Sequence, residues 1–447
     1  MQVTEANSEV YVPPVKKSLP VVGDSWALFK HPHQYLLKQE KTYGRVFFSN
    51  VFFMNSLFML EPDAVQFMLR NKDDIFAAAP VYNKLLGKLR SLTSMDFAPH
   101  RLHRRLLKPV FNRAALIGYV DQMNASMHVD AGGWEAEPNP SFYTLAEDVS
   151  RNIGASVFMG LEDHPDKDKV TQAMMALSDS ASSIIRYPLP GNRWNKALKS
   201  HGYLQFFFQN LLNQYRHQGS QDRKDMLSVM LQSFEESGEA FTDTEIIDHI
   251  KLIVGAAHDT SVSATTTMMY FMIRYPEWQE RLREQMLALD QASPDYAALD
   301  KLDLTRYVFQ EALRILPPIQ SIHRTAVKSF KFRGQIYPEG TELCTVPQFL
   351  HHLPEFWTEP YQFDPMRFAP GREEHKQHSC LWFPFSAGAH TCIGLQIAEM
   401  FSKLLMFHLL TRYRFKAVPG HDLSGYKKEF YGFGRFKNRL PVVIEKL

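Results

Sequence analysis

The sequence has 447 residues, of which 45% are hydrophobic and 13% aromatic, so it can bury a large core. The 50 Lys and Arg residues nearly balance 48 Asp and Glu residues, and a net charge of +2 gives no overall field of the kind that nucleic-acid-binding proteins use. The three cysteines, Cys344, Cys380 and Cys392, are too few and too widely spaced for a disulfide framework and indicate a reducing compartment.

The N-terminal segment, residues 1–17, is polar and contains Pro13 and Pro14. It has no apolar run that could serve as a signal peptide or membrane anchor. We find no apolar segment of about 18 residues elsewhere, because the windows near Leu252 and Leu404 carry charged or polar breaks. These features predict a soluble cytoplasmic protein without a membrane anchor.

The first hundred residues mix short β-like runs, 45–53 and 56–60, with helical patches such as 62–71. Helical spacing dominates the rest. It is clearest in three stretches: 144–161, 170–185 and 201–217. Neither an internal repeat nor a linker divides the chain. The pattern predicts a mainly α protein with small β-sheets, organised as a single domain over residues 1–447 with a β-rich part at about 1–100.

A long helix is predicted from residue 242 onward. Thr242 and Glu245 form a capping box, and the helical pattern continues until Pro276 ends it. Roughly 30 residues at 1.5 Å each give about 45–50 Å, enough to cross a domain. In its middle, residues 255–261, small residues and a polar pair interrupt the apolar pattern. A flat ligand could lie against the backbone there.

A reactive cysteine is predicted in the segment 383–394. Cys392 lies just ahead of a helical pattern over 396–413, and a helix N-terminus favours an anionic sulfur. Gly388 and Gly394 would permit tight turns around the sulfur, and Phe385 would pack beside it and limit water. The alternative is a buried structural cysteine on a turn.

This segment resembles the haem-binding loop of the cytochrome P-450 superfamily, in which Phe, Gly, Cys and Gly recur at these intervals. Two further segments resemble the family in the expected order. Glu311 and Arg314 match its Glu-x-x-Arg helix, and the run 363–368 matches its Phe-x-Pro-x-Arg-Phe meander. The resemblance covers the chain from the proline-containing lead to the last strand.

The resemblance implies the cytochrome P-450 fold of the soluble bacterial type, a triangular prism with haem b between a long central I helix and an L helix. Cys392 would be the axial ligand of the haem iron. Glu311, Arg314 and Arg367 would form a triad in which two guanidinium groups hold one carboxylate behind the haem. Alone, Glu311 and Arg314 would be an ordinary i,i+3 helical pair.

Four further residues match the family's ligands for the haem propionates. His100 and Arg104 share one helix face in the basic run 100–105, His390 precedes the cysteine by two positions, and Arg324 follows the Glu-x-x-Arg helix. The alternative for a basic run is a solvated helix face.

Asp259 and Thr260 match the acid-alcohol pair that the family places on its I helix. The resemblance assigns them to proton delivery during oxygen reduction, with Ala256 one turn earlier on the same side. The alternative is a threonine bonded to its own helix carbonyls and an exposed aspartate. The chain has Ala257 where the family usually has glycine, so the helix distortion there would be shifted toward Gly255.

Apolar or small residues in segments that line the family's pocket predict a hydrophobic substrate such as a terpenoid, steroid, retinoid-like molecule or fatty acid. The same residues would also suit a packed core. They are Phe76, Tyr82, Leu85, Phe97, Leu252, Gly255, Ile319, Ile322, Tyr431 and Phe433.

The resemblance implies a monooxygenase that uses O2 and two electrons. The chain has no flavin or nicotinamide motif, so a separate ferredoxin or flavodoxin with its reductase would be the donor, and nucleic acid is no partner. The expected docking surface comprises Arg101, Arg105, Lys108 and Lys403. The alternatives are a peroxide-using or isomerising haem-thiolate enzyme, and a haem sensor or carrier without turnover.

Overall fold

The structure, a computed structural model, describes residues 24–51, 54–86, 90–180, 183, 186–218, 223–237, 241–421, 423 and 439–447. It is mainly helical, as predicted. The α-helices are α1 (Ser25–Lys30), α2 (Pro32–Tyr43), α3 (Pro62–Arg70), α4 (Ala79–Leu86), α5 (Phe97–Leu107), α6 (Arg113–Asp130), α7 (Phe142–Ile153), α8 (Lys167–Asp179), α9 (Arg193–Gln218), α10 (Met226–Ser237), α11 (Asp243–Arg274), α12 (Pro276–Leu287), α13 (Tyr296–Asp300), α14 (Asp303–Ile315), α15 (Pro347–Leu350) and α16 (Leu395–Leu410).

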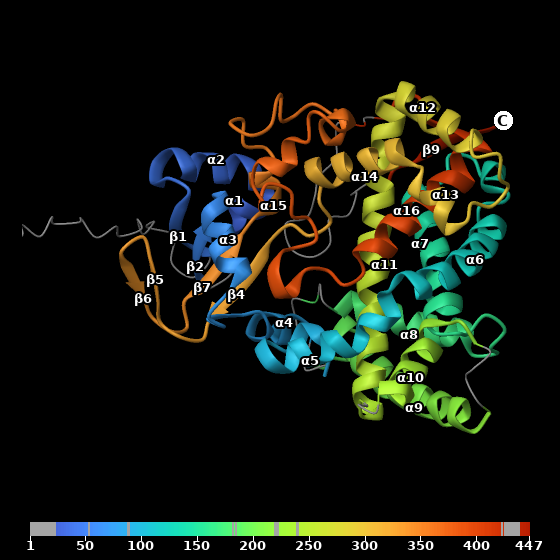
Figure 1. Ribbon diagram of the computed structural model, residues 1–447, viewed down its shortest axis with the longest axis horizontal. Coiled ribbons are helices and arrows are strands. Elements are labelled where there is room, and N and C mark those ends of the chain that lie inside the picture. Colours follow the sequence, from blue (N-terminus) through green and yellow to red (C-terminus); the bar gives the residue numbers. More distant parts are fainter. Residues whose placement is uncertain are drawn as a thin grey trace, which may run out of the picture.

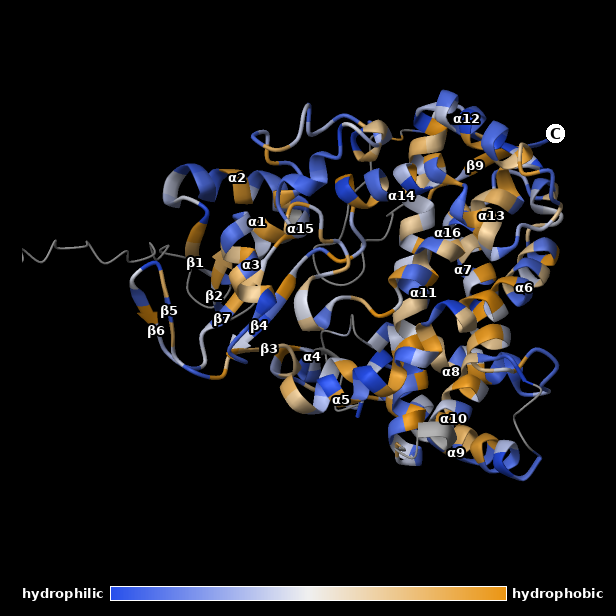
Figure 2. Cartoon of the chain, in the orientation of Figure 1, coloured by the Kyte–Doolittle hydropathy of each residue, from blue (hydrophilic) through white to orange (hydrophobic). Residues whose placement is uncertain are grey.

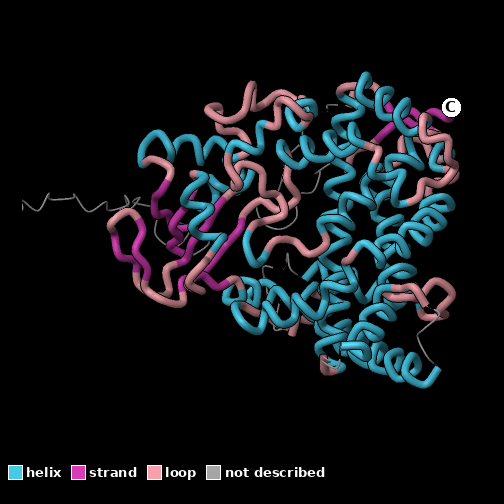
Figure 3. The backbone as a smooth tube through the Cα atoms, viewed as in Figure 1, coloured by secondary structure: helices cyan, strands magenta, loops and turns pink. Residues whose placement is uncertain are grey.

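Strands gather at one end of the molecule, apart from one pair near the C-terminus (Figure 3). They are β1 (Val46–Val51), β2 (Met54–Met59), β3 (Phe76–Ala77), β4 (Ile322–Ala326), β5 (Phe330–Phe332), β6 (Gln335–Tyr337), β7 (Glu342–Thr345), β8 (Tyr413–Ala417) and β9 (Val442–Lys446). The main sheet has the order β1-β2-β7-β4-β3. The β-rich part is therefore not built from residues 1–100 alone, because β4 and β7 return from the second half of the chain to complete it.

The long predicted helix is α11, and its start is confirmed. The Thr242 hydroxyl accepts from the Glu245 N–H, and the Glu245 carboxylate accepts from the Thr242 N–H at 2.9 Å. Its 32 residues give about 48 Å of length. The helix runs through the helical part of the molecule and packs against α7, α8, α14 and α16 (Figure 1). Its central position places α11 beside α16, the helix that follows Cys392.

One segment among the described residues, Gly388–Leu410, is long and apolar enough to cross a membrane by length and composition. The sequence expectation that the chain has no such segment is wrong in this respect. Of its most apolar window, 67% is buried inside the protein, as in a core helix. Figure 2 shows hydrophobic residues along α16 and α11, whereas α12 at the periphery carries a hydrophilic face. Packing against the rest of the chain accounts for this apolar composition.

Two large hydrophobic cores hold the described residues together. One lies among the helices around α11 and α16, and the other lies around the main sheet with α2, α3 and α15. The segment that carries Cys392 runs from the sheet side to the start of α16. Phe383 belongs to the core around the sheet and Ile393 packs against the core among the helices, so Cys392 lies between the two cores.

Candidate functional site

Cys392 lies on a turn fixed by its own backbone. Its N–H donates to the carbonyl of Phe385 at 2.9 Å, and the Thr391 N–H donates to the carbonyl of Gly388 at 3.1 Å. Gly388 has φ 69°, and a Cβ there would lie 2.0 Å from the carbonyl oxygen of Leu69 at the end of α3. Only glycine fits both requirements. Gly394 differs from its predicted role, because its φ of −90° is open to any residue.

The Cys392 side chain is exposed to a cavity of about 280 Å³, whereas Cys344 and Cys380 are buried. Burial in the surrounding protein raises the pKa of the Cys392 thiol, and the Gly394 N–H and the Arg104 guanidinium act in the opposite direction without outweighing it. The helix terminus and the arginine thus favour an anionic sulfur, as expected, yet a counter-charge is still needed to hold the thiolate at neutral pH.

The cavity lies between α11 and α16 and extends to α5 and the loop after α14. Its lining is mostly apolar, which suits a hydrophobic guest. The lining residues are Leu92, Thr93, His100, Arg104, Leu107, Phe111, Phe158, His249, Leu252, Ile253, Ala256, Ala257, Thr260, Ser261, Ala264, Phe309, Leu313, Pro318, Ile319, Pro384, Phe385, His390, Thr391, Cys392, Ile393, Gly394, Ile397 and Ala398.

Of the predicted substrate-pocket residues, Leu252 and Ile319 line this cavity. Phe76 and Ile322 do not, because they are strand residues buried in the core around the sheet. Gly255 also lies elsewhere, facing Ser178 of α8 on the other side of α11.

Tyr82 and Phe97 are half-buried outside the cavity lining. Tyr82 instead supports Arg324, whose pKa it raises by hydrogen bonding, although burial lowers that pKa overall. Tyr431 and Phe433, and the side chain of Leu85, lie outside what the structure describes.

The predicted propionate ligands form a basic cluster. His100, Arg104 and His390 line the cavity, and the ring centroids of His100 and His390 lie 4.0 Å apart. Arg324 is buried close enough to affect His100 but is not a lining residue. Burial, with His390 and Arg104, lowers the pKa of His100 to about 4, so its ring is neutral at pH 7.

Asp96, at the start of α5, anchors this cluster. Nε2 of His390 donates to the Asp96 carboxylate at 3.0 Å, and the N–H groups of Ala78 and Ala79 donate to it at 2.8 and 2.9 Å. Burial acts to raise the pKa of Asp96, but these hydrogen bonds bring it below its ordinary value. Asp96 is thus a carboxylate that fixes the His390 ring, and no sequence signal had marked it.

Hydrogen bonds within the basic cluster are incomplete. Nδ1 of His100 is buried without a partner among the described residues. The Arg104 guanidinium lines the cavity; burial lowers its pKa and the charge of Cys392 raises it. A buried polar atom without a hydrogen-bond partner costs free energy of folding. A ligand with carboxylate groups would therefore bind favourably to these side chains.

The predicted triad is present on α14 and the segment after it. Arg314 donates to both carboxylate oxygens of Glu311, at 2.6 and 2.9 Å, and Arg367 donates to Glu311 at 3.1 Å. All three side chains are fully buried. Arg367 also donates to Glu374 at 2.7 Å, a fourth member that the sequence patterns did not identify. We call these four residues the ionic lock.

The acid and the alcohol of α11 point to different sides. Thr260 lines the cavity, and its hydroxyl donates to the Ala256 carbonyl at 2.7 Å, the back-bonded arrangement that the sequence left open. Asp259 is buried away from the cavity lining, where the Ser178 hydroxyl donates to it at 2.8 Å. Thr260 therefore faces the cavity, and Asp259 lies on the side of α11 that packs against α8.

Two other predicted positions can be placed. Phe385 packs its ring near Phe309 and Trp382 beside the Cys392 turn. Lys403 is wrong as a docking residue, since it is buried, pairs with Glu399 at 2.7 Å and donates to the Leu299 carbonyl. Arg101, Arg105 and Lys108 are exposed on α5.

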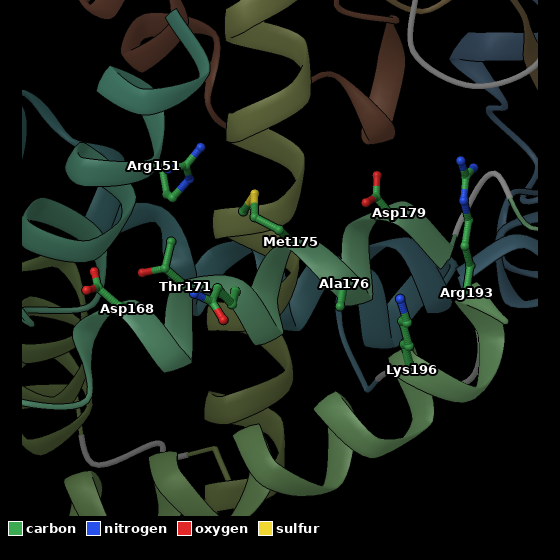
Figure 4. A pocket seen from close by; sticks show the side chains of 9 residues that line it. Arg151, Asp168, Thr171, Met175, Ala176, Asp179, Arg193 and Lys196 are labelled. Atoms are coloured by element: carbon green, nitrogen blue, oxygen red, sulfur yellow. The ribbon is translucent and has the colours of Figure 1, made fainter. Parts of the chain in front are cut away.

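A second cavity of about 650 Å³ lies away from Cys392, between α7, α8 and α9 (Figure 4). Charged side chains border it: Arg151, Asp168, Asp179, Arg193 and Lys196. Their opposite charges partly balance one another, and the cavity is shared with none of the predicted site residues. Most of the residues predicted to bind a cofactor line the Cys392 cavity instead.

Comparisons with known proteins identify the family of the chain. The family model described as Cytochrome P450 matches residues 13–437. Cytochrome P450 136 of Mycobacterium tuberculosis is 31% identical over 404 residues, covering 89% of this chain and 81% of that protein. Cyclooctat-9-en-7-ol 5-monooxygenase of Streptomyces melanosporofaciens is 26% identical, covering 96% and 94%. A cyanobacterial chain, retinoic acid-bound CYP120A1, has a TM-score of 0.86 at 22% identity, covering 98% of this chain and 100% of its own, and so shares the fold.

Proposed function

Because the chain belongs to the cytochrome P450 family and is a cytochrome P450 monooxygenase, we propose that it hydroxylates a hydrophobic small molecule with electrons from a separate redox protein. The overall reaction consumes O2, two electrons and two protons and forms one alcohol and one water. The observation that carries the proposal is Cys392 facing a mostly apolar cavity next to Arg104 and the unpartnered Nδ1 of His100.

The residues fit a haem whose iron would be held by a cysteine sulfur. Cys392 would hold the iron, and Arg104, His100 and His390 would hold the propionates, with Arg324 behind them. The unpartnered His100 Nδ1 is the test of this fit, because a protein without an anionic ligand there would leave a buried polar atom unsatisfied. Such a haem supplies the reduction of O2 and the insertion of one oxygen atom into a C–H bond.

Thr260 is the residue proposed to direct protons within the cavity. Since its hydroxyl proton is given to the Ala256 carbonyl, its oxygen remains free to accept a hydrogen bond from a water molecule. Asp259, behind it, is proposed to supply protons from the Ser178 side of α11 after a side-chain rotation. The small side chains of Ala256 and Ala257 leave space in the cavity beside Thr260.

The substrate proposed is a terpenoid, steroid, retinoid-like molecule or fatty acid, because the lining is mainly apolar. Relatives support this range by what their names state: abscisic acid for a hydroxylase of Arabidopsis thaliana, and cyclooctat-9-en-7-ol for the Streptomyces monooxygenase. The proposed electron donor is a ferredoxin or flavodoxin with its reductase, and the proposed location is the cytoplasm. Peroxide-driven, isomerising or non-catalytic haem proteins are the alternatives.

The experiment is to purify the protein, quantify haem b and record the reduced carbon monoxide complex. We expect one haem per chain and the long-wavelength band from which the family takes its name, with loss of that band in Cys392→His. A Cys392→His protein that kept the band would overturn the assignment of the ligand. Product formed with O2 and a reduced ferredoxin, but not with peroxide alone, would separate the monooxygenase from the alternatives.

A further inference from the structure

A row of three polar side chains leads from the start of α11 to the cavity. The carboxylate of Glu245 lies 3.8 Å from Nε2 of His103, and Nδ1 of His103 lies 3.0 Å from Nε2 of His249. Both rings are buried, and the ring of Phe241 packs against them at 4.5 and 4.9 Å. His249 is a lining residue of the Cys392 cavity. The row therefore ends at the cavity wall.

The row fixes which ring nitrogen carries the proton. Burial acts to raise the pKa of Glu245, but hydrogen bonds from Thr242 and the nearby His103 hold it below its usual value, so Glu245 is charged. Burial keeps the pKa of His103 below its ordinary value, so that ring is neutral and has one N–H. The carboxylate favours this N–H on Nε2 of His103. Nδ1 of His103 then accepts, and Nε2 of His249 donates to it.

The other nitrogen of His249 is consequently an acceptor. Burial, with His103, lowers the pKa of His249 to about 3, so the ring is neutral and Nδ1 carries a lone pair. His249 is 0% exposed, and Nδ1 has no hydrogen-bond partner among the described residues. A buried acceptor without a donor is costly, and this one belongs to a residue on the wall of the substrate cavity.

The position of His249 on α11 also sets its distance from Thr260. His249, Ile253, Ala256 and Thr260 follow one another by three or four residues and all line the cavity, so they share one helix face. Thr260 lies three turns beyond His249, roughly 16 Å along the helix axis at 1.5 Å per residue. A group bound at His249 is therefore far from the oxygen chemistry proposed near Thr260.

We propose that Nδ1 of His249 accepts a hydrogen bond from a hydroxyl group of the substrate, with His103 and Glu245 as positioning residues. This rests on the proposed function, since it names the substrate class of the same cavity. The substrate is an apolar molecule that already carries an alcohol at one end and is oxidised at a carbon remote from it. The reaction that supplies this substrate is one that leaves a free hydroxyl on a hydrocarbon skeleton.

The test compares decan-1-ol with its methyl ether, which has the same oxygen but no donor. Binding to the haem-loaded protein is measured by titration calorimetry, which needs no turnover. The alcohol should bind about five- to tenfold more tightly than the ether, the effect of one net hydrogen bond, and His249→Leu should bring this ratio to about one. An equal affinity in the native protein, binding of neither probe, or an unchanged ratio in His249→Leu would each overturn the inference.

Two further variants separate recognition from structural support. His103→Leu frees the His249 ring to present an N–H, so decan-2-one, which only accepts, should gain severalfold relative to the alcohol. His258→Leu is the matched control, because His258 is a buried histidine of α11 that faces Ser150 outside the cavity lining, and it should leave every ratio unchanged. A native protein without the carbon monoxide band would overturn the proposed function, whereas an intact band with an unaltered ratio in His249→Leu would overturn this inference alone.

Discussion

The ionic lock and the basic cluster at the cavity both remove charged side chains from water, but they differ in how their hydrogen bonds are completed. In the lock, Glu311 accepts from Arg314, Arg367 and the Asp364 N–H, and both guanidinium groups also donate to backbone carbonyls. In the basic cluster, Nδ1 of His100 has no partner among the described residues, and the Arg104 side chain lines the cavity.

The difference separates structural support from ligand binding. A buried ionic group whose donors and acceptors all find partners within the chain needs nothing further, and it contributes to the fold. A buried group left with open donors is costly in the free protein and gains when a complementary ligand arrives. On this basis the lock should govern stability and the basic cluster should govern retention of the haem.

The largest effect is expected from the lock. Glu311→Ala leaves two buried guanidinium groups without their carboxylate and should lower the free energy of unfolding by about 3–5 kcal/mol, measured by denaturant unfolding. Asp303→Ala is the control, because it breaks an exposed i,i+3 pair with Arg306 on the same helix and should cost at most about 1 kcal/mol. Equal losses in the two variants would refute the structural role of the lock.

The basic cluster should show the opposite pattern. Arg104→Ala should weaken haem binding about tenfold or more, because a charge-assisted bond to a carboxylate is lost, and should change the unfolding of the haem-free protein by less than about 1 kcal/mol. The measurement is the rate of haem transfer to a haem-free acceptor protein. The neighbouring Arg105→Ala is the control, since that side chain is exposed. Equal transfer rates would remove Arg104 from the propionate site.

A pH dependence sharpens the comparison further. The folded-state pKa of His100 is about 4, below its ordinary 6.5, so the unfolded chain binds the proton first. The resulting stability is present above pH 6.5 and is lost as the pH falls toward 4. Between pH 7 and pH 5 this amounts to at most about 2 kcal/mol. His100→Gln should lose less stability over this interval by that amount, and an identical loss would contradict the assignment.

The smallest effect concerns the outer face of α5, where basic residues meet water instead of the cavity. Arg105 and Lys108 are exposed there and serve as the probes of an acidic redox partner. Reversing both to Glu should slow reduction about three- to tenfold at low salt and little at high salt. Lys199→Glu with Lys376→Glu changes the net charge equally at other exposed positions. Should that control slow reduction as much, the partner docks elsewhere.

Some features of the site could be read from the sequence because neighbouring residues decide them. The capping box of α11 and the turn at Gly388 depend on contacts within a few positions or on one backbone angle. The family and the fold class are confirmed, since the motifs that carry them recur at fixed intervals. Helical spacing also put Ala256 and Thr260 on one face of α11, and both line the cavity.

Other features required the packed structure. Asp96 and Glu374 complete the basic cluster and the ionic lock, but they are ordinary acidic residues in sequence. Phe76 and Ile322 are apolar, as cavity residues often are. Their strands pair within the main sheet, however, and their side chains lie in the hydrophobic core around it. A signal for His249 did exist, because it precedes Ile253 and Ala256 at helical spacing, but its partner His103 lies on another helix.

The sequence by itself determined the long helix α11, the turn at Gly388 before Cys392 and the chemical family, because these depend on residue type and short-range spacing. The tertiary structure decided which polar atoms remain without partners and which side chains reach the cavity. The physical reason is that a buried hydrogen bond is completed or left open by side chains from segments far apart in the chain, and only their packing brings them within 3 Å or so of one another.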